Sequence, residues 1–493
     1  MPELPDRLDE CRASFEASLP EAPEDEAFFS MSSTTYPHAE EQPGAAGARL
    51  EARTAEDLAL HRIVVVGGGA AGLELVTRLG DRLGRRARAR ITLVECARSH
   101  IWKPLLHEVA AGSLDPGEHE VNYLAQAHWH GFRYYFGAMI GLDRSAKEVH
   151  LAANFDDEGR QITPPRSVGY DTLVIAIGSV TNDFGTPGVA EHAVPLETPA
   201  QAARFNRRLV NACIRAQTQE GPVRPGQLHV AIIGAGATGA ELAAEVHRTT
   251  REVVAYGLDR IDPERDIRIV LVEAADRILP ALPERISKTA RRLLDRMRIE
   301  VHTGAKVMEV TVDGLRLADG SFIASELVVW AAGVKAPDVL RDLDRLEVNR
   351  INQLIVEPTL QTTCDPNIFA IGDCAACPRQ GEPNPVPPRA QAAHQEAAHM
   401  VRQLERRLRG QPLLPFTYRD FGSLVSLGRH STVGSLMGFM PGRGIFVEGL
   451  FARVMYHSLR LLHERALNGG AYAFLGLLSR ALSRRTGPPV KLH

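Results

Sequence analysis

The stretch RIVVVGGGAAGLELVTRL, residues 62–79, decides the fold of this chain. A short β-branched run leads into a glycine turn, and an apolar helical pattern follows it. In Gly67-x-Gly69-x-x-Gly72 the first glycine permits a tight turn, the second lets backbone N–H groups approach a pyrophosphate, and the third lets the helix pack close to the strand. The next strand, ITLVE, ends at Glu95, where a carboxylate would hold a ribose hydroxyl. This order of elements predicts a dinucleotide-binding βαβ unit.

The same order returns at residues 229–246 as HVAIIGAGATGAELAAEV. Its glycines are Gly234, Gly236 and Gly239, and the strand that follows ends at Glu273 after a longer connection than is usual. A carboxylate there accepts from a free ribose hydroxyl but repels a 2′-phosphate, so the sequence favours NADH over NADPH. A surface glutamate paired with arginine is the alternative. Two such units in one chain imply two dinucleotide-binding domains.

Two apolar runs, TLVIAIG (172–178) and ELVVWAAG (326–333), are predicted to be buried strands that return to the cofactor face. The stretch IFAIGDCA (368–375) is typical of two-dinucleotide flavoproteins, in which an Asp after Ile-Gly meets the flavin ribityl chain. Asp373 is therefore expected to bind a ribityl hydroxyl, which assigns FAD to the first glycine loop and NADH to the second. An ordinary Gly-Asp turn is the alternative. The predicted fold class is α/β with two Rossmann-like domains: an FAD domain split over 61–185 and 346–409, and an inserted NADH domain over 186–345.

Composition indicates a globular protein of two or three domains, with 493 residues of which 44% are hydrophobic. Six cysteines in so long a chain do not form a disulfide framework, and the N-terminal MPELPDRLDE does not resemble a secretion signal. The basic residues are scattered and lack an aromatic-basic motif, which excludes a nucleic-acid partner. Residues 1–60 hold 14 Asp and Glu against 4 Lys and Arg, and are expected to be a disordered acidic extension.

Residues 410–493 are expected to form a membrane-associating segment. From Pro441 to His493 there are 8 Lys and Arg against 2 Glu, and apolar residues fall at helical spacing in 449–467 and 472–485. Basic amphipathic helices of this kind lie in the headgroup plane, with apolar side chains buried and arginines at anionic lipid. Helices docked on the protein's own body, or at a homodimer interface, are the alternatives. No apolar run is long enough to span a bilayer, so no route for proton translocation is expected.

Together with HIWKPLLHEVAAGSLD (100–115) and PPRAQAAHQ (387–395), these motifs resemble the type II NADH dehydrogenases. These are the non-pumping NADH:quinone oxidoreductases of bacterial and mitochondrial membranes, and the C-terminal stretches are similar to the bacterial branch. The resemblance runs from about residue 61 to the C-terminus. It implies a tightly bound, non-covalent FAD, NADH as substrate, a membrane quinone as acceptor, and a peripheral location on the cytoplasmic face of the inner (plasma) membrane.

The resemblance also implies roles for single residues. Gln391 and Gln395 share a helix face and would donate to a quinone carbonyl without adding charge to an apolar pocket. Glu241 matches a glutamate near the nicotinamide and the flavin and is the candidate proton relay, while Lys103 would stabilise negative charge on the reduced flavin. The further residues implied at the cofactors are Gly372, Asp373, Ala390 and Gln391 for FAD, and Gly333 for NADH. No metal site is predicted.

Each of these roles has a plainer alternative: an ordinary alanine-rich helix, a first-turn glutamate favoured by the helix dipole, and a surface lysine. A different activity is suggested by Cys374-Ala-Ala-Cys377, because a C-x-x-C can serve as a dithiol relay in a soluble NADH-dependent flavin disulfide reductase. The pair follows the Ile-Gly-Asp box, as in bacterial members of the resembled family, which favours a packing role. A membrane-recruited NADH-sensing flavoprotein, with the acidic extension as a docking arm, is the third possibility.

Overall fold

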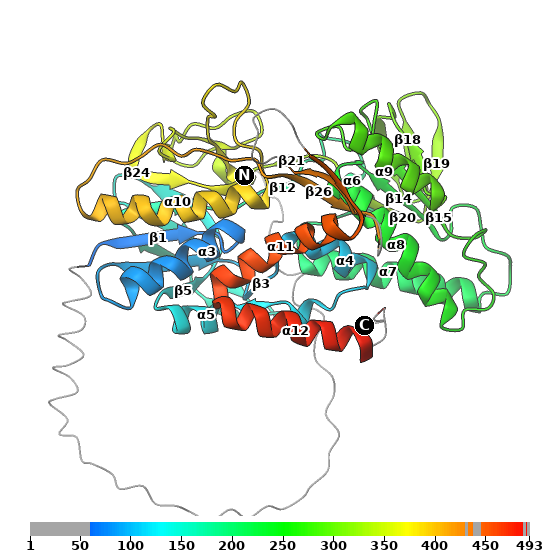
Figure 1. Cartoon of the computed structure of the whole chain (residues 1–493), viewed down its shortest axis with the longest axis horizontal. Helices are drawn as coiled ribbons and strands as arrows, with labels where there is room; N and C mark the ends of the chain where they lie inside the picture. The colour runs from blue at the N-terminus through cyan, green and yellow to red at the C-terminus, as the bar shows by residue number, and fades with distance from the viewer. Residues whose placement is uncertain (1–59, 429–431, 437–444, 487–489, 491–493) are drawn as a thin grey trace, which may run out of the picture.

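The structure is a computed structural model that describes residues 60–428, 432–436, 445–486 and 490. The acidic extension expected over residues 1–60 lies outside the described residues, apart from residue 60. Figure 1 shows two α/β halves side by side, with the helix of residues 449–468 crossing the middle of the view and the helix of residues 470–486 along its lower edge. None of the helices in the described ranges combines the length and the apolar character that crossing a bilayer requires.

The first half is built on a sheet of six strands that is parallel except at one edge. Its central strands are buried on both faces because helices cover both, which explains their continuous β-branched sequences. The strand order is β23 (Gln361–Thr362), β24 (Asp365–Ala370), β11 (Thr172–Ile175), β1 (Arg62–Val66), β2 (Arg90–Glu95) and β5 (Arg133–Phe136). The helices of this half are α3 (Ala70–Leu79), α5 (Tyr123–His130) and α10 (Ala390–Leu408).

The second half repeats this plan with a parallel sheet of five strands. The strand order is β13 (Ala193–Pro195), β20 (Leu327–Trp330), β14 (His229–Ile233), β15 (Arg268–Val272) and β16 (Glu300–His302). Its helices are α6 (Val189–His192), α7 (Pro199–Thr218), α8 (Ala237–Ala255) and α9 (Glu284–Arg296). Both predicted buried runs are strands, β11 and β20, and each lies beside the strand that precedes a glycine loop. The predicted α/β class with two Rossmann-like units is confirmed.

Smaller antiparallel sheets extend both halves. In the first half they comprise β6 (Met139–Asp143), β7 (Glu148–Leu151) and β10 (Arg166–Gly169), and the pairs β3 (Ser99–His100) with β4 (Val121–Asn122) and β8 (Asn154–Phe155) with β9 (Gln161–Thr163). In the second half they comprise β17 (Val307–Thr311), β18 (Gly314–Leu317) and β19 (Phe322–Ala324). The short parallel pair β22 (Leu354–Ile355) and β25 (Ala375–Ala376) adjoins the Ile-Gly-Asp turn.

The chain passes between the halves through a pair of antiparallel strands, β12 (Val180–Thr181) and β21 (Val334–Lys335). After β21, Ala336 and Leu340 already belong to the core of the first half. We therefore place the return crossing near residue 335, about ten residues before the boundary expected from the sequence.

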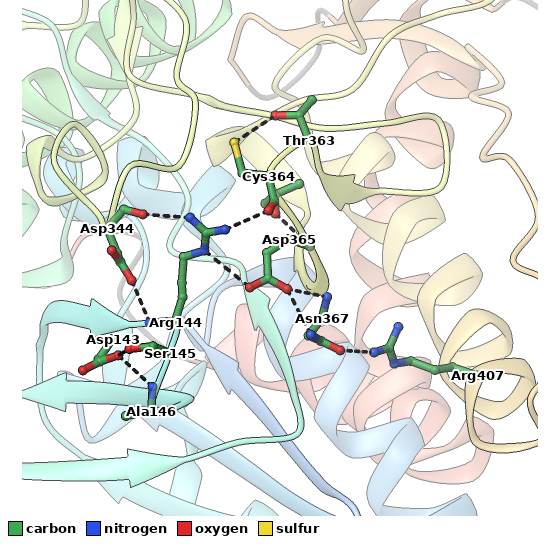
Figure 2. A network of polar contacts seen from close by, with 11 residues as sticks. Asp143, Arg144, Ser145, Ala146, Asp344, Thr363, Cys364, Asp365, Asn367 and Arg407 are labelled. Atoms are coloured by element: carbon green, nitrogen blue, oxygen red, sulfur yellow. Dashed lines mark hydrogen bonds and ion pairs between the residues drawn. The ribbon is translucent and has the colours of Figure 1, made fainter.

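A polar network holds the two sequence segments of the first half together (Figure 2). Arg144, in the β6–β7 turn, donates to the backbone carbonyls of Asp344 and Cys364 and lies 3.4 Å from the carboxylate of Asp365. Farther along the network, Arg407 of α10 donates to the carbonyl of Pro366. The contacts of Arg144 join residues 200 to 221 positions apart in the sequence, as a domain split in sequence requires.

Residues 100–115 lie between the halves rather than in one of them. Their helix α4 (Leu106–Ala111) packs against α7 and α8, and Trp102 and Leu106 belong to the core of the second half. The strand and helix that follow, β4 and α5, belong to the first half: Val121 packs against its core and Tyr123 lies within it. This stretch, one of the two on which the family resemblance is most specific, thus fixes how the two halves sit against each other.

The C-terminal part, for which membrane association stays a prediction, contains both a sheet and helices. It begins with a three-stranded antiparallel sheet, β26 (Gly422–Ser426), β27 (Thr432–Leu436) and β28 (Ile445–Glu448), followed by α11 (Gly449–Asn468) and α12 (Gly470–Thr486). Helix α11 packs against α3 and this sheet, with Ala452, His463 and Leu467 buried, so it docks on the protein's own body. The helical periodicity was predicted correctly, but periodicity alone does not tell a protein-facing stripe from a lipid-facing one.

Candidate dinucleotide and flavin site

In the first glycine loop, backbone atoms pack so closely against Gly67 and Gly72 that a side chain would not fit. A Cβ on Gly67, whose φ is +105°, would lie 2.3 Å from the carbonyl oxygen of Ala176, and one on Gly72 would lie 1.8 Å from the carbonyl oxygen of Gly67. Only glycine fits such approaches. Glu95 closes the loop from the next strand: its Oε2 accepts from Gly68 N at 2.5 Å. The carboxylate thus lies beside the glycine loop, where the sequence placed it.

The second loop reproduces this geometry. A Cβ on Gly239 would lie 1.9 Å from the carbonyl oxygen of Gly234, and Glu273 Oε2 accepts from Ala235 N at 2.7 Å. The other oxygen of Glu273 accepts from Ala275 N at 2.9 Å, just as Glu95 Oε1 accepts from backbone N–H groups after β2. Backbone N–H groups therefore hold Glu273, whereas the alternative considered from the sequence was a surface glutamate paired with arginine.

Both loops leave open the place where a pyrophosphate would lie. Gly69 and Gly236 are the N-caps of α3 and α8, and a Cβ on either would meet nothing within 4 Å. Neither cap has a side-chain hydrogen bond, so the first-turn N–H groups are available to an anion. The residues present therefore fit a dinucleotide at each loop.

A third element faces the first loop. Gly372, with φ +73°, lies so that a Cβ would be 3.6 Å from Ala71 Cβ of α3. Next to it, Asp373 accepts from the Ser179 hydroxyl at 2.8 Å, and Lys103 Nζ donates to the Ser179 carbonyl at 2.9 Å. The structure therefore joins Lys103 and Asp373, which the sequence singled out separately, through Ser179.

The two glutamines of α10 contact a neighbouring loop. Gln391 donates to the carbonyl of Gly422 at 3.0 Å and accepts from Phe421 N at 3.2 Å. Gln395 donates to the carbonyl of Arg419 at 2.9 Å and accepts from Arg419 N at 3.0 Å. Both amides hold the entry to β26 in this structure, so a direct hydrogen bond to a quinone requires one of these bonds to be exchanged. Ala390 is the first residue of α10, and Gly333, with φ +68°, faces the Phe184 ring.

Glu241 is buried, with 7% of its surface exposed, and does not lie in the first turn of α8. Its Oε1 accepts from Ser426 N at 2.9 Å, its Oε2 lies 3.8 Å from His107 Nδ1, and the Tyr456 hydroxyl donates to it. Burial raises the pKa of Glu241, although His107 and the Ser426 N–H oppose the shift. The group is suited to exchange a proton nearer neutrality than an exposed carboxyl.

Several buried polar residues were missed by the sequence reading. Burial raises the pKa of Glu396 in α10 to about 8, and its Oε2 accepts from Gly372 N at 2.5 Å. Glu74 of α3 is fully buried between His394 and His463. One signal could have revealed Glu74, because it follows Gly72 by two residues, just as Glu241 follows Gly239.

The cysteine pair does not have the surroundings of a dithiol relay. Cys374 and Cys377 are buried and unpaired with each other, and burial raises the pKa of each thiol to about 12. Thiols in such surroundings stay protonated and unreactive at neutral pH. Among the described residues no three His, Cys, Asp or Glu side chains gather as metal ligands.

Comparison with known proteins places this geometry in a family. Residues 61–397 match the pyridine nucleotide-disulphide oxidoreductases. The type II NADH:quinone oxidoreductase of Haemophilus influenzae is 41% identical over 446 residues, covering 88% of this chain and all of that protein. The type II NADH:quinone oxidoreductase NdhA of Mycobacterium tuberculosis is 29% identical, over 84% of this chain and 87% of its own.

Solved structures agree on the fold. NDH2 from Plasmodium falciparum in complex with NADH superposes with a TM-score of 0.73 at 17% identity, covering 88% of this chain and 99% of that one. The sulfide:quinone oxidoreductase of Aquifex aeolicus superposes with a TM-score of 0.65 at 17% identity, covering 83% and 92%. Taken with the sequence relatives, the duplicated glycine loops and the buried glutamate of α8 identify the chain as an oxidoreductase that belongs to the type II NADH:quinone oxidoreductases.

Proposed function

We propose that this protein oxidises NADH and reduces a membrane quinone through a tightly bound, non-covalent FAD, without pumping protons. The observation that carries the proposal is the pair of complete dinucleotide cradles, each closed by a carboxylate held on backbone N–H groups. A bound flavin would supply the redox chemistry by accepting a hydride and releasing two electrons. The family relatives named above support NADH and quinone as the two substrates.

FAD is assigned to the first loop. Gly67, Gly69 and Gly72 form the pyrophosphate turn, and Glu95 binds the adenosine ribose. Asp373 and Gly372 reach the same cofactor from the other sequence segment, because β24 lies in the sheet next to β11 and leads directly into them. Ala390 and Gln391 begin α10 beside the same turn, where Glu396 of that helix bonds Gly372.

NADH is assigned to the second loop, formed by Gly234, Gly236 and Gly239. The carboxylate of Glu273 would repel the 2′-phosphate of NADPH, which disfavours NADPH. Gly333 follows β20 at the same edge of the sheet and lets the backbone come close to the Phe184 ring, where a Cβ would lie 2.4 Å from it. The residues after these parallel strands thus converge on one substrate.

Residues at the junction of the two halves supply a positive charge and exchange a proton. Lys103 offers a positive charge on the flavin side, held in place by its bond to Ser179. Glu241, with the pKa raised by burial, is positioned between α4, α8 and α11 to take up or release a proton near the nicotinamide. Gln391 and Gln395 shape the quinone side by holding the strand that leads to Ser426, which in turn bonds Glu241.

We place the membrane contact on α12 rather than on α11. Both α12 and α5 lie at the lower edge of the view in Figure 1. Their exposed large apolar side chains are Leu124 and Trp129 of α5 and Tyr472, Phe474, Leu475, Leu477 and Leu478 of α12. Apolar and aromatic side chains on a helix with nearby basic residues suit the boundary of an anionic bilayer. This is consistent with a peripheral protein on the cytoplasmic face of the inner membrane, where a quinone dissolved in lipid is in reach.

The assignment of the two loops is tested by a matched pair of variants. Gly69→Ala and Gly236→Ala keep allowed backbone angles, with φ of −66° and −69°, and place a methyl group in open space. The fold should therefore survive in both. We expect Gly69→Ala to be purified with little flavin, and Gly236→Ala to keep its flavin but bind NADH about tenfold more weakly or worse. The reverse pattern would overturn the assignment.

A further inference from the structure

Both glycine loops carry a buried glutamate at the same place. Each repeat reads G-x-G-x-x-G-x-E, so that Glu74 is the counterpart of Glu241. The exposed fractions of these residues are 0% and 7%. Burying a carboxylate is costly unless partners compensate it. A buried carboxylate at matching places on both dinucleotide-binding helices therefore calls for a functional explanation on the FAD side as well.

Side chains from three helices lie around the carboxylate of Glu74. Arg78 of α3 lies 2.6 Å from its Oε1, and His394 Nδ1 of α10 lies 2.8 Å from its Oε2. His463 Nδ1 of α11 lies 3.9 Å from the same Oε2. Burial alone would raise the pKa of Glu74, but the interactions with His394 and His463 hold it below its usual value. Glu74 is therefore a carboxylate that faces two imidazoles.

The tautomer of His463 follows from its neighbour His100. Burial lowers the pKa of His100 to about 3, so its ring is neutral. The His100 ring bonds the backbone of Gly68 and has its Nε2 3.1 Å from His463 Nε2. A neutral ring that donates to a carbonyl through Nδ1 accepts at Nε2. His463 must then donate through Nε2, which leaves its Nδ1, the atom facing Glu74, to take up a proton.

A small cavity lies beside His463. Its volume is about 30 Å³, enough for a water molecule. Polar side chains line it toward the surface, where Glu464 and Arg460 keep 19% and 11% of their side chains exposed and Arg460 donates to His119. The lining also includes His100, Trp102 and His463.

The other end of the cluster lies in α10. His394 stands between Gln391 and Gln395, and helical geometry places all three side chains within an arc of about 100°. The side chain of His394 is 25% exposed, whereas Glu74 is not exposed at all. The cluster thus runs from a water-sized cavity beside α11 to the helix that carries the proposed quinone-site glutamines.

We propose that His463, Glu74 and His394 form a proton relay that delivers the water-derived proton to the quinone. The proposal rests on the proposed function, whose balance is NADH + H⁺ + quinone → NAD⁺ + quinol. NADH supplies two electrons and one proton as hydride, and the second proton comes from water. His463 takes that proton at Nδ1 and passes it to the Glu74–His394 pair, and His394 gives it to the quinone oxygen. Each group then returns to its starting protonation state.

This relay is distinct from Glu241. Glu241 lies on α8, the helix of the NADH loop, and is contacted by Tyr456 of α11. In this scheme Glu241 handles the proton that arrives as part of the hydride. Tyr456 and His463 are seven residues apart on α11, so they lie about 10 Å apart along one side of that helix. Helix α11 therefore touches the buried glutamate of each half.

The relay is tested by separating the two half-reactions in the full-length, flavin-bound protein. In His463→Gln the rate constant for reoxidation of the NADH-reduced protein by a short-chain quinone should fall about 10²-fold. The rate constant for reduction by NADH should stay unchanged, and added imidazole should restore part of the reoxidation rate. The matched control is His399→Gln: His399 is a buried histidine of the same helix as His394, its Nε2 is bonded to the Leu414 carbonyl, and its variant should change neither step.

A spectroscopic measurement on the wild type checks the relay without relying on a rate. Infrared difference spectra during reoxidation by quinone should show a transient protonated-carboxyl band, and Glu74→Gln should lack it. Absence of the band in the wild type, its persistence in Glu74→Gln, or reoxidation of a folded His463→Gln at the wild-type rate would overturn the relay. A wild-type protein that NADH reduces but quinone does not reoxidise would instead contradict the proposed function.

Discussion

Burial decides which carboxylates of this protein can exchange protons near neutral pH. Glu241 and Glu396 have raised pKa values because they are desolvated, and each retains only partial compensation from backbone N–H groups. Glu74 is equally buried but stays ionised because charged or chargeable partners surround it. Three buried glutamates therefore fall into two groups: Glu241 and Glu396 have raised pKa values, whereas that of Glu74 is lowered.

Glu241→Gln should lower the turnover of quinone reduction about 10²-fold, because the variant keeps the shape and the Ser426 hydrogen bond but has no titratable side chain. Stopped-flow absorbance of the flavin would measure both half-reactions. Glu245→Gln, one turn later on α8 and paired with Arg248 at 2.5 Å, is the control. It should cost stability and leave turnover unchanged. Equal losses of turnover in both variants would argue against a specific role for Glu241.

Glu396 should make the protein less stable as pH rises. Its usual pKa of 4.5 is raised to about 8 in the folded state, so between these values the folded protein holds a proton that the unfolded chain has released. Stability should fall by up to about 1.4 kcal/mol per pH unit across that window. Glu396→Gln should flatten the profile, as seen in thermal melts from pH 5 to pH 8. An unchanged slope would mean that Glu396 is ionised throughout.

The cysteine pair should be dispensable for electron transfer. The double variant Cys374→Ala, Cys377→Ala removes two buried thiols whose pKa values are near 12 and which are not joined to each other. We expect NADH:quinone turnover within about twofold of the wild type, with a modest loss of stability because small cavities remain. Loss of quinone reduction in a folded, flavin-loaded double variant would instead support the dithiol alternative.

Among single residues, the sequence predicted those whose type is restricted by the local backbone or by a place at the end of a strand. Gly67 and Gly234 were identifiable because no other residue fits their turns, and Glu95 and Glu273 followed from their place at strand ends. The partnership of Glu74 with His463 was not predictable, since 389 positions separate them and a lone histidine in an amphipathic helix gives no signal of its target.

At the scale of elements, α11 and α12 show what a pattern can and cannot decide. Both helices have the apolar spacing of an amphipathic helix, and both were predicted as such. In the structure α11 covers α3 and the β26–β28 sheet, while five large apolar side chains are exposed in the part of α12 whose side chains are described, residues 470–479. Whether an apolar stripe faces protein or lipid depends on which other surface lies beside it. Tertiary packing decides this, and the local sequence does not.

The lipid contact of α12 should be removable by point changes. Phe474 and Leu475 are 65% and 58% exposed, so replacing both with Glu should not disturb the core. We expect the variant to lose sedimentation with anionic vesicles while still oxidising NADH with a water-soluble quinone. Ser479→Glu, which adds charge on the same helix without removing apolar surface, is the control and should bind vesicles. Vesicle binding by the Phe474, Leu475 variant equal to that of the wild type would contradict a membrane role for α12.

At the scale of the whole molecule, the two halves are copies of one plan held together by segments from elsewhere in the chain. Residues 100–115 pack on the second half although their strand neighbours belong to the first, and α11 contacts a buried glutamate of each half. The duplicated plan was predictable because it rests on local patterns of strand, glycine turn and helix. The joining segments were not, because their apolar residues could have packed on either half.

The most direct test of the central claim is an anaerobic absorbance titration of the purified full-length protein. We expect a yellow protein whose flavin spectrum bleaches with one equivalent of NADH and far more slowly with NADPH. The spectrum should return when a quinone is added but not when a protein disulfide is added. A colourless protein that binds no flavin on reconstitution, or a reduced flavin that only a disulfide reoxidises, would contradict it.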